Sequence, residues 1–115
     1  MDELDPVFDA VARYFSMLSE PMRLRIVRTI CEEEKSVSQI VEALSASQTN
    51  VSRHLGLMHR AGVLARRKEG NQVYYQVADE TLVDICRTAC NRIAGRMVEK
   101  KPLRRELLRL MPAVK

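Results

Sequence analysis

The chain has 115 residues, of which 46% are hydrophobic and 4% aromatic, and it carries a formal net charge of +4. The length allows one domain with one modest core, and the composition excludes an intrinsically disordered chain. The sequence contains no apolar run near the roughly 18 residues of a membrane-spanning helix and no secretory signal, so we expect a cytoplasmic protein without a membrane partner. Because aromatic residues are few, aliphatic side chains must fill the core, which favours helices.

The N-terminal part of the chain predicts two helices. Residues 7–18 place large apolar side chains at helical spacing. The second helix is expected to begin in "SEPMRLRI", where Ser19 can act as the N-cap and Pro21 fits the first turn because it lacks a backbone N–H. The face of this helix that packs on the core is expected to contain Leu24, Val27 and Cys31.

Two shorter segments follow, joined by the turn "SASQ". The first, "SVSQIVEAL", predicts a short amphipathic helix. The second, "SQTNVSRHLGLMHRAG", predicts a helix that buries Val51, Leu55 and Met58. It is expected to end near Gly62, since glycine is typical at helix C-termini.

The remaining sequence predicts a hairpin and a long helix. "VLARRKEGNQVYYQV" contains two short β-prone runs around "EGNQ", which favours a β-hairpin. A final helix is expected from about Glu80 to Glu99. We find no internal repeat and no linker, so residues 1–115 are expected to form a single domain with its core at 7–99 and a basic extension at 100–115. The predicted fold is mainly α with a small β-hairpin.

Two short helices joined by a tight turn, the second opening with small polar residues, are typical of a helix-turn-helix. Base edges in the DNA major groove offer donors and acceptors, which amides, hydroxyls and arginine can read. The candidate reading residues are Ser47, Gln48, Thr49, Asn50, Ser52, Arg53 and His54. Considered alone, "SQTN" is nearly as typical of an ordinary N-cap followed by a solvated turn.

The hairpin is basic and favours the DNA-binding interpretation. Residues 53–68 contain five basic residues and no acid, which fits a polyanion-binding face, although charge alone fits a solvated surface equally well. The hairpin residues expected at flanking phosphates or in a minor groove are Arg66, Arg67, Lys68 and Asn71. A helix that reads bases beside a basic hairpin predicts a winged helix-turn-helix that binds double-stranded DNA.

These motifs resemble the ArsR/SmtB family of bacterial winged helix-turn-helix repressors. "LSEPMRLRI" is similar to the family's L-x-x-P-x-R-L-x-I helix, "SQTNVSRHLGLMHRAGV" to its reading helix, and "RKEGNQVYY" to its wing. The resemblance covers roughly residues 7–95. It implies a homodimer through the first and last helices, which represses transcription from an inverted-repeat operator.

The predicted last helix has a long apolar stripe that a dimer would bury. The expected interface residues on this helix are Leu82, Cys86, Ala89, Ile93 and Met97. Those on the first helix are Val7, Val11 and Tyr14.

The resemblance also identifies family metal sites that this sequence lacks. The family's last-helix zinc ligands fall at Asp79, Thr81, Arg92 and Gly95, of which only the first is a ligand type. The family's C-x-C pair is absent from "SVSQIVE". We therefore expect no resident cofactor.

Three cysteines, Cys31, Cys86 and Cys90, are the candidate sensor thiols. On a helix, residues four apart have Cβ atoms about 5–6 Å from each other, whereas a disulfide needs about 3.8 Å. A soft metal, arsenite or an inserted sulfur chain could bridge Cys86 and Cys90 with less strain than a direct disulfide.

Local charge ranks the thiols. Glu32–Glu34 should disfavour a thiolate at Cys31, whereas Arg87 should favour one at Cys90. We therefore expect Cys90 to react first with reactive sulfur or an oxidant, and Cys31 or Cys86 to resolve it, which would release DNA. Inert packing of the thiols and soft-metal sensing remain the alternatives.

Two other classes of protein fit less well. An enzyme is not expected, because the sequence has no Gly-rich phosphate loop, no nucleophile elbow and no zinc-hydrolase His pair. A winged helix used only for protein–protein contact would not need the basic hairpin.

Overall fold

The computed structural model describes residues 2–96 and 109. Its elements are α1 (Asp5–Ser16), α2 (Pro21–Ile30), β1 (Lys35–Ser36), α3 (Val37–Leu44), α4 (Gln48–Arg60), β2 (Leu64–Glu69), β3 (Gln72–Val77) and α5 (Glu80–Arg96). The mainly helical winged helix-turn-helix fold is confirmed. The predicted end of the last helix at Glu99 and the basic extension at 100–115, apart from Arg109, lie outside the described residues.

The sheet has three antiparallel strands in the order β1-β3-β2. The predicted hairpin is confirmed, with Glu69 paired with Gln72 across the turn. Gly70 begins this turn with a φ of 60°, a left-handed conformation that glycine adopts without strain. Strand β1 was not predicted, since a two-residue strand is too short to show an alternating pattern.

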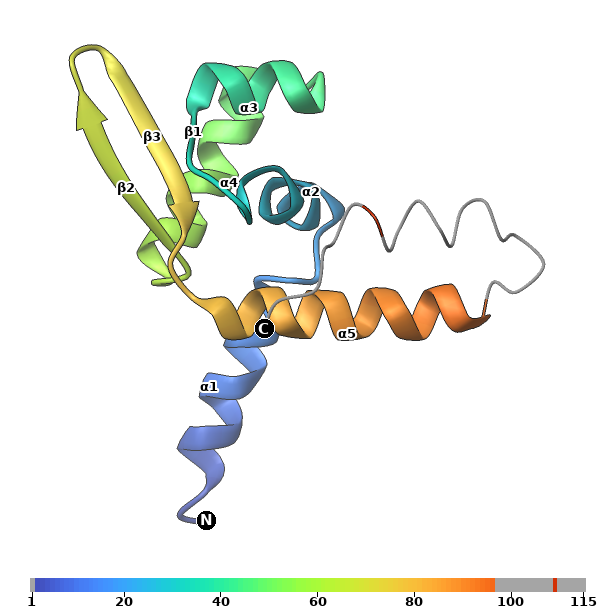
Figure 1. Cartoon of the computed structure of the whole chain (residues 1–115). Coiled ribbons are helices and arrows are strands. Elements are labelled where there is room, and N and C mark those ends of the chain that lie inside the picture. Colours follow the sequence, from blue (N-terminus) through green and yellow to red (C-terminus); the bar gives the residue numbers. More distant parts are fainter. Residues whose placement is uncertain (1, 97–108, 110–115) are drawn as a thin grey trace.

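The core lies where α2, α3, α4 and the N-terminal half of α5 meet the sheet. Its buried residues are Ile26, Val27, Ile30, Ile40, Val51, Leu55, Met58, Val63, Leu64, Tyr75, Leu82, Val83 and Cys86. Figure 1 shows the hairpin and the α3–α4 pair at one end of the molecule and α1 and α5 at the other. In the described part of the chain, no helix is long and apolar enough to cross a membrane.

Two details of α2 differ from the prediction. The N-cap is Glu20, whereas the Ser19 hydroxyl donates a 2.8 Å hydrogen bond to the Ser16 carbonyl. The buried face consists of Ile26, Val27 and Ile30. The helix has two apolar stripes that share Val27, and the sequence pattern alone does not distinguish them; Leu24, on the other stripe, is 40% exposed.

Candidate nucleic-acid interface

The N-terminal turn of α4 is polar, exposed and capped by its own sequence. Ser47 is the N-cap, and its Oγ accepts a 3.1 Å hydrogen bond from the Asn50 backbone N–H. Arg53 Nη2 donates to Asn50 Oδ1 at 2.7 Å, so the guanidinium is held on the surface of the helix. The exposed members of the predicted reading set are Ser47, Gln48, Thr49, Ser52 and Arg53, and Asn50 is half-buried.

The opposite face of α4 is anchored in the core. Val51, Leu55 and Met58 are fully buried, as predicted. These side chains follow one another by four and three residues, so they form one stripe directly behind the polar face. Burial of three large apolar side chains fixes the rotation of the helix about its axis, and with it the direction in which the polar residues point.

His54 was assigned to the reading set, and this assignment is wrong. Its side chain is only 4% exposed, since it lies on the α2 side of α4 and its Nδ1 is 3.3 Å from Arg23 Nη1. Burial, followed by the charges of Arg53 and Arg23, lowers the pKa of His54, and Glu20 opposes them. Neither Arg23 nor this contact was predicted from the sequence, where Arg23 appears only as one residue of the "EPMRL" motif.

The end of α4 fixes where the wing begins. Gly62 follows the C-cap residue Ala61 and has a φ of 84°. Its N–H donates to the His59 carbonyl at 3.0 Å, and the Val63 N–H donates to the Met58 carbonyl at 3.2 Å. This pattern is a Schellman motif, in which a left-handed residue reverses the chain. The reversal leads directly into β2 and places the wing beside the reading helix.

The basic residues of the wing divide between the two faces of the hairpin. Arg66 pairs with Tyr75 and Lys68 with Val73, on the face that carries the buried Tyr75 ring. Arg67 pairs with Tyr74 on the other face. A β-strand alternates its side chains in this way, so three consecutive basic residues cannot point at one target.

Arg67 is committed to contacts within the chain. Its Nε and Nη2 donate to the Glu34 carboxylate at 2.9 and 2.7 Å, and its Nη1 donates to Glu69. Its guanidinium also lies 4.5 Å from the centre of the Tyr74 ring. These two carboxylates hold the pKa of Arg67 above its usual value. Arg67 therefore fastens the wing to the α2–β1 turn, whereas Arg66 and Lys68 remain the better candidates for phosphate contacts.

The cysteine side chains lie on neighbouring elements. Cys86 is buried in α5, whereas Cys90, one turn on, and Cys31, the C-cap residue of α2, are half-buried. Burial, and then the nearby thiols of Cys90 and Cys31, raises the pKa of Cys86 to about 11. Burial and Glu32 raise the pKa of Cys31, as the sequence suggested.

The expected activation of Cys90 is contradicted. Burial raises the pKa of Cys90. The guanidinium of Arg87, expected to favour the thiolate, forms an ion pair with Asp84, Nη2 to Oδ1 3.3 Å. A cation that is paired within its own helix does little to stabilise a thiolate one turn away.

An apolar groove of about 440 Å³ runs between α1, α2 and α5. It is lined by Phe15, Leu18, Leu24, Ile85, Cys86, Ala89, Cys90 and Ile93. The large apolar side chains of α1 that remain exposed are Val7, Phe8, Val11 and Phe15. Phe15 belongs to both sets, and α1 and α5 therefore expose apolar side chains at the end of the molecule away from the wing.

The predicted dimer residues fall into four groups. Val7, Val11, Ala89 and Ile93 are exposed. Leu82 is fully buried within the protomer, so its inclusion in an intermolecular stripe is wrong; the first turns of α5 pack on the core. Cys86 is also buried but lines the apolar groove. Tyr14 is half-buried and directed at its own chain, where its hydroxyl donates to Asp79. Met97 lies outside the described residues.

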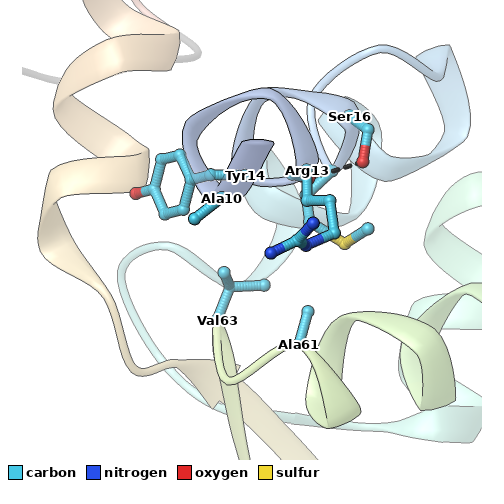
Figure 2. Close-up of a pocket in the computed structure, with 7 residues that line it drawn as sticks. Ala10, Arg13, Tyr14, Ser16, Ala61 and Val63 are labelled. Carbon is cyan, nitrogen blue, oxygen red and sulfur yellow. Dashed lines mark hydrogen bonds between the residues drawn. The ribbon is translucent and has the colours of Figure 1, made fainter. Parts of the chain in front are cut away.

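A second hollow, of about 370 Å³, lies between α1 and the turn that follows α4. Figure 2 shows Arg13 and Ala10 of α1 opposite Ala61 and Val63. Figure 2 also shows the Tyr14 ring turned to the opposite side of α1 from Ser16, toward the start of α5. The hollow separates α1 from the segment that leads into β2, the first strand of the wing.

The metal site that the family resemblance identified is not assembled here. Asp79 Oδ2 accepts from Tyr14 and Oδ1 accepts from the Thr81 backbone N–H at 3.0 Å, so both oxygens are engaged. Among residues 2–96 and 109, no group of three or more His, Cys, Asp or Glu side chains is arranged to hold a metal ion.

Comparison with known proteins agrees with this geometry. Residues 20–66 match the model of the arsR family of bacterial regulatory proteins. The HTH-type transcriptional regulator Rv0081 of Mycobacterium tuberculosis is 31% identical over 88 residues, which cover 76% of this chain and 77% of that protein. A probable mercury resistance operon repressor of Streptomyces lividans is 32% identical over 77 residues, which cover 67% of this chain and 62% of the repressor.

Solved structures show the same fold. The crystal structure of Rv0081 superposes with a TM-score of 0.70 at 26% identity, over 84% of this chain and 97% of that one. The homodimeric winged helix-turn-helix DNA-binding domain of Mb0332 from Mycobacterium bovis superposes with a TM-score of 0.67 at 24% identity, over 87% and 88% of the two chains.

Proposed function

The chain belongs to the arsR family of bacterial regulatory proteins, and we propose that it is a homodimeric transcriptional repressor that binds an inverted-repeat operator through α4 and the wing. The observation that carries this proposal is the two-sided character of α4. Its first turns present hydroxyls, amides and Arg53 to solvent, while Val51, Leu55 and Met58 fix the helix from behind. Such a rigid polar face suits the donors and acceptors of the major groove.

The wing supplies the complementary contacts in this proposal. Arg66 and Lys68 extend from an exposed strand beside α4, and Asn71 lies in the turn at its tip. Phosphate contacts of this kind fix the position of a reading helix without reading sequence. Arg67, with its partners Glu34 and Glu69, holds the wing in place and does not itself contact DNA.

The exposed apolar surface of α1 and α5 supports the dimer. Monomeric proteins rarely leave several neighbouring large apolar side chains in water. A second copy of the chain would cover Val7, Val11 and Phe15 together with the groove beside Ile93. A two-fold axis through this surface would place the two α4 helices in successive major grooves, about 34 Å apart, which matches an inverted repeat.

We further propose that a thiol-reactive signal releases the DNA. Peroxide is one such signal: a first thiolate attacks an oxygen, giving a sulfenic acid and hydroxide, and a second thiol then displaces water to form a disulfide. Support comes from the neighbouring positions of Cys31, Cys86 and Cys90 at the groove and the core beneath it. A bridge there would alter the packing of α5 against α2, and a coupling of about 1–3 kcal/mol suffices to reduce DNA affinity.

The alternative signal is a soft metal or arsenite at Cys86 and Cys90. Its support is the sequence similarity to a probable mercury resistance operon repressor and the thiol chemistry of the two residues. Against it, the described residues offer no cluster of three ligands, so a bound ion would have two thiolates or would recruit ligands from elsewhere. A DNA-binding regulator with inert cysteines is the remaining alternative. In each case we expect a non-enzymatic protein that acts in the cytoplasm.

The proposal is tested with the reduced protein and duplex DNA. An operator is first selected from a random-sequence library and its affinity is measured by fluorescence anisotropy at two salt concentrations. Operator affinity should fall steeply with salt, by orders of magnitude for several phosphate contacts, and exceed that for random DNA. A protein that selects no sequence and stays monomeric in sedimentation would contradict the repressor proposal.

The signal is tested on the same complex. Polysulfide, peroxide, mercuric ion and arsenite are added in turn to the wild-type protein and to the variant with alanine at Cys31, Cys86 and Cys90. A response that the triple variant loses assigns the signal to the thiols. A loss of DNA affinity that persists in the triple variant excludes thiol sensing. If no reagent changes the DNA affinity of the wild-type protein, the cysteines serve only in packing.

A further inference from the structure

His54 differs from its neighbours on α4 because it is polar and yet buried, with 4% of its surface exposed. Its Nδ1 lies 3.3 Å from Arg23 Nη1. A guanidinium has no acceptor, so the imidazole nitrogen accepts this hydrogen bond and must be unprotonated. The contact therefore defines the proton position: a neutral His54 with its N–H on Nε2.

Arg23 uses its other donors on the end of α1. Nη2 donates to the Ser16 carbonyl at 3.0 Å, and Nε donates to the Met17 carbonyl at 3.2 Å. Ser16 is the last residue of α1 and Met17 is its C-cap, so their carbonyls depend on partners outside the helix; the Ser16 carbonyl also accepts from the N–H and the hydroxyl of Ser19. A cation at this end also complements the helix dipole. One side chain of α2 thus joins the end of α1 to the middle of α4.

We propose that Arg23 and His54 are a positioning pair, which holds α4 at its operator-binding orientation relative to α1. This inference rests on the proposed function, in which α4 reads DNA and α1 belongs to the dimer interface. In a dimer that reads two half-sites, the angle between α1 and α4 determines the spacing and tilt of the two reading helices. A small rotation of α4 relative to α1 would therefore misplace both reading helices of the dimer at once.

The charges around His54 make the Arg23–His54 contact sensitive to protonation of the imidazole. Arg23 from α2 contacts the imidazole, the charge of the neighbouring Arg53 on α4 also acts on it, and Glu20, the N-cap of α2, is the acidic group near it. An imidazolium would lose the acceptor for Arg23 and would be repelled by both arginines. Burial and these arginines lower the pKa of His54, so the neutral, accepting form is present at neutral pH.

The test compares variants of both residues in the full-length protein. Arg23→Met and His54→Leu remove the donor and the acceptor, and His54→Asn keeps an oxygen acceptor close to the position of Nδ1. Arg25→Met is the matched control, since it removes one positive charge from an exposed site on the same helix. Each variant is measured for its affinity to the selected operator, its affinity to random-sequence duplex, its dimer mass and its melting temperature.

Arg23→Met and His54→Leu should each weaken operator binding about tenfold with less than about twofold change on random duplex, and the double variant should lose no more than either one. His54→Asn should retain most of the affinity. As the pH is lowered below the usual histidine range, wild-type operator affinity should fall relative to that of His54→Asn. Arg25→Met should resemble the wild type on the operator.

Three results would overturn the inference. The melting temperatures of the variants could fall while operator affinity is unchanged, which assigns the pair a purely structural role. The fold-losses in operator affinity of the two single variants could multiply in the double variant, which would show that Arg23 and His54 act independently. The affinities for the operator and for random duplex could fall equally, which would show that Arg23 contributes only its positive charge. If Arg23→Met does not fold, the His54→Leu and His54→Asn comparison decides alone; a wild type that binds no operator refutes the proposed function instead.

Discussion

The hydroxyl of Tyr14 donates a 2.7 Å hydrogen bond to the Asp79 carboxylate, across 65 residues of sequence. The other oxygen of Asp79 accepts from the Thr81 backbone N–H, so this carboxylate also caps the first turn of α5. Asp79 is the one ligand-type residue at the last-helix metal site that the family resemblance implies. In this chain it joins α1 to α5, the two helices proposed for the dimer.

Replacing Tyr14 with phenylalanine should lower the free energy of unfolding by about 1–3 kcal/mol, because a hydrogen bond to a charged, partly buried group is lost. Urea denaturation measures the change. Tyr74→Phe is the matched control, since it removes a phenol hydroxyl from the wing and keeps the ring that lies under Arg67. Equal losses in the two variants would show that the Tyr14–Asp79 contact contributes nothing specific.

The same contact predicts a pH dependence at high pH. Burial, followed by the hydrogen bond to Asp79, raises the pKa of Tyr14 from its usual 10.0 to about 12. A raised folded-state pKa means that the protonated phenol stabilises the fold, so this contribution is complete below pH 10 and is lost as the pH rises toward 12. Ultraviolet titration of tyrosinate should show a late-titrating component, which disappears in Tyr14→Phe.

Much of the fold was predictable because its signals are local. The stripe of Val51, Leu55 and Met58 defined the buried face of α4, and the Gly-Asn turn defined the hairpin. The face of α2 was not predictable, because Leu24 and Ile26 start two apolar stripes of equal regularity that diverge after Val27. Only the partner elements decide which stripe is buried.

The candidate site was predicted less completely than the fold. Its polar residues were found by type and position, but His54 was assigned by type alone, although its position three residues after Val51 and four before Met58 is on the buried face of α4. Its partner Arg23 is 31 residues away and could not be identified from the sequence. Glu34 was considered only for its effect on Cys31, since its pairing with Arg67 requires the hairpin to fold back beside α2. The expected thiol activation at Cys90 failed for a local reason: Asp84 lies three residues before Arg87 on the same helix and pairs with it, and this partner was not considered in the prediction.

Arg53→Ala should weaken binding to the selected operator by about 1–3 kcal/mol while leaving the dimer intact. Arg53 is exposed and held by Asn50 near the N-terminus of α4, where base edges would be met. Anisotropy titration gives the affinity and sedimentation gives the dimer mass. Arg60→Ala, a loss of the same charge at the far end of α4, is the control; an equal effect from both would indicate general electrostatics in place of base reading.

The two faces of the wing should respond differently to loss of charge. Lys68→Gln should weaken operator and random DNA alike and reduce the dependence of log affinity on log salt by about one, because one phosphate contact is lost. Arg67→Gln should change the salt dependence little and should detach the wing from Glu34. Hydrogen exchange in β2 and β3 measures the detachment. A salt dependence reduced equally by both variants would place Arg67 at the DNA.

The thiols should react slowly and in an order set by burial. Burial raises the pKa of all three, and burial followed by the nearby thiols of Cys90 and Cys31 raises that of Cys86 to about 11. Only the thiolate is the nucleophile, so the half-buried Cys31 and Cys90 should be alkylated before the buried Cys86.

Mass spectrometry of the iodoacetamide-treated protein gives the alkylation rate of each cysteine, and each rate should still be rising at pH 9, the usual pKa of a thiol. In urea the three rates should converge, since the differences come from the fold. If the alkylation rate of Cys90 levelled off near neutral pH, its thiolate would be stabilised after all. Arg87 would then activate Cys90 despite its ion pair with Asp84.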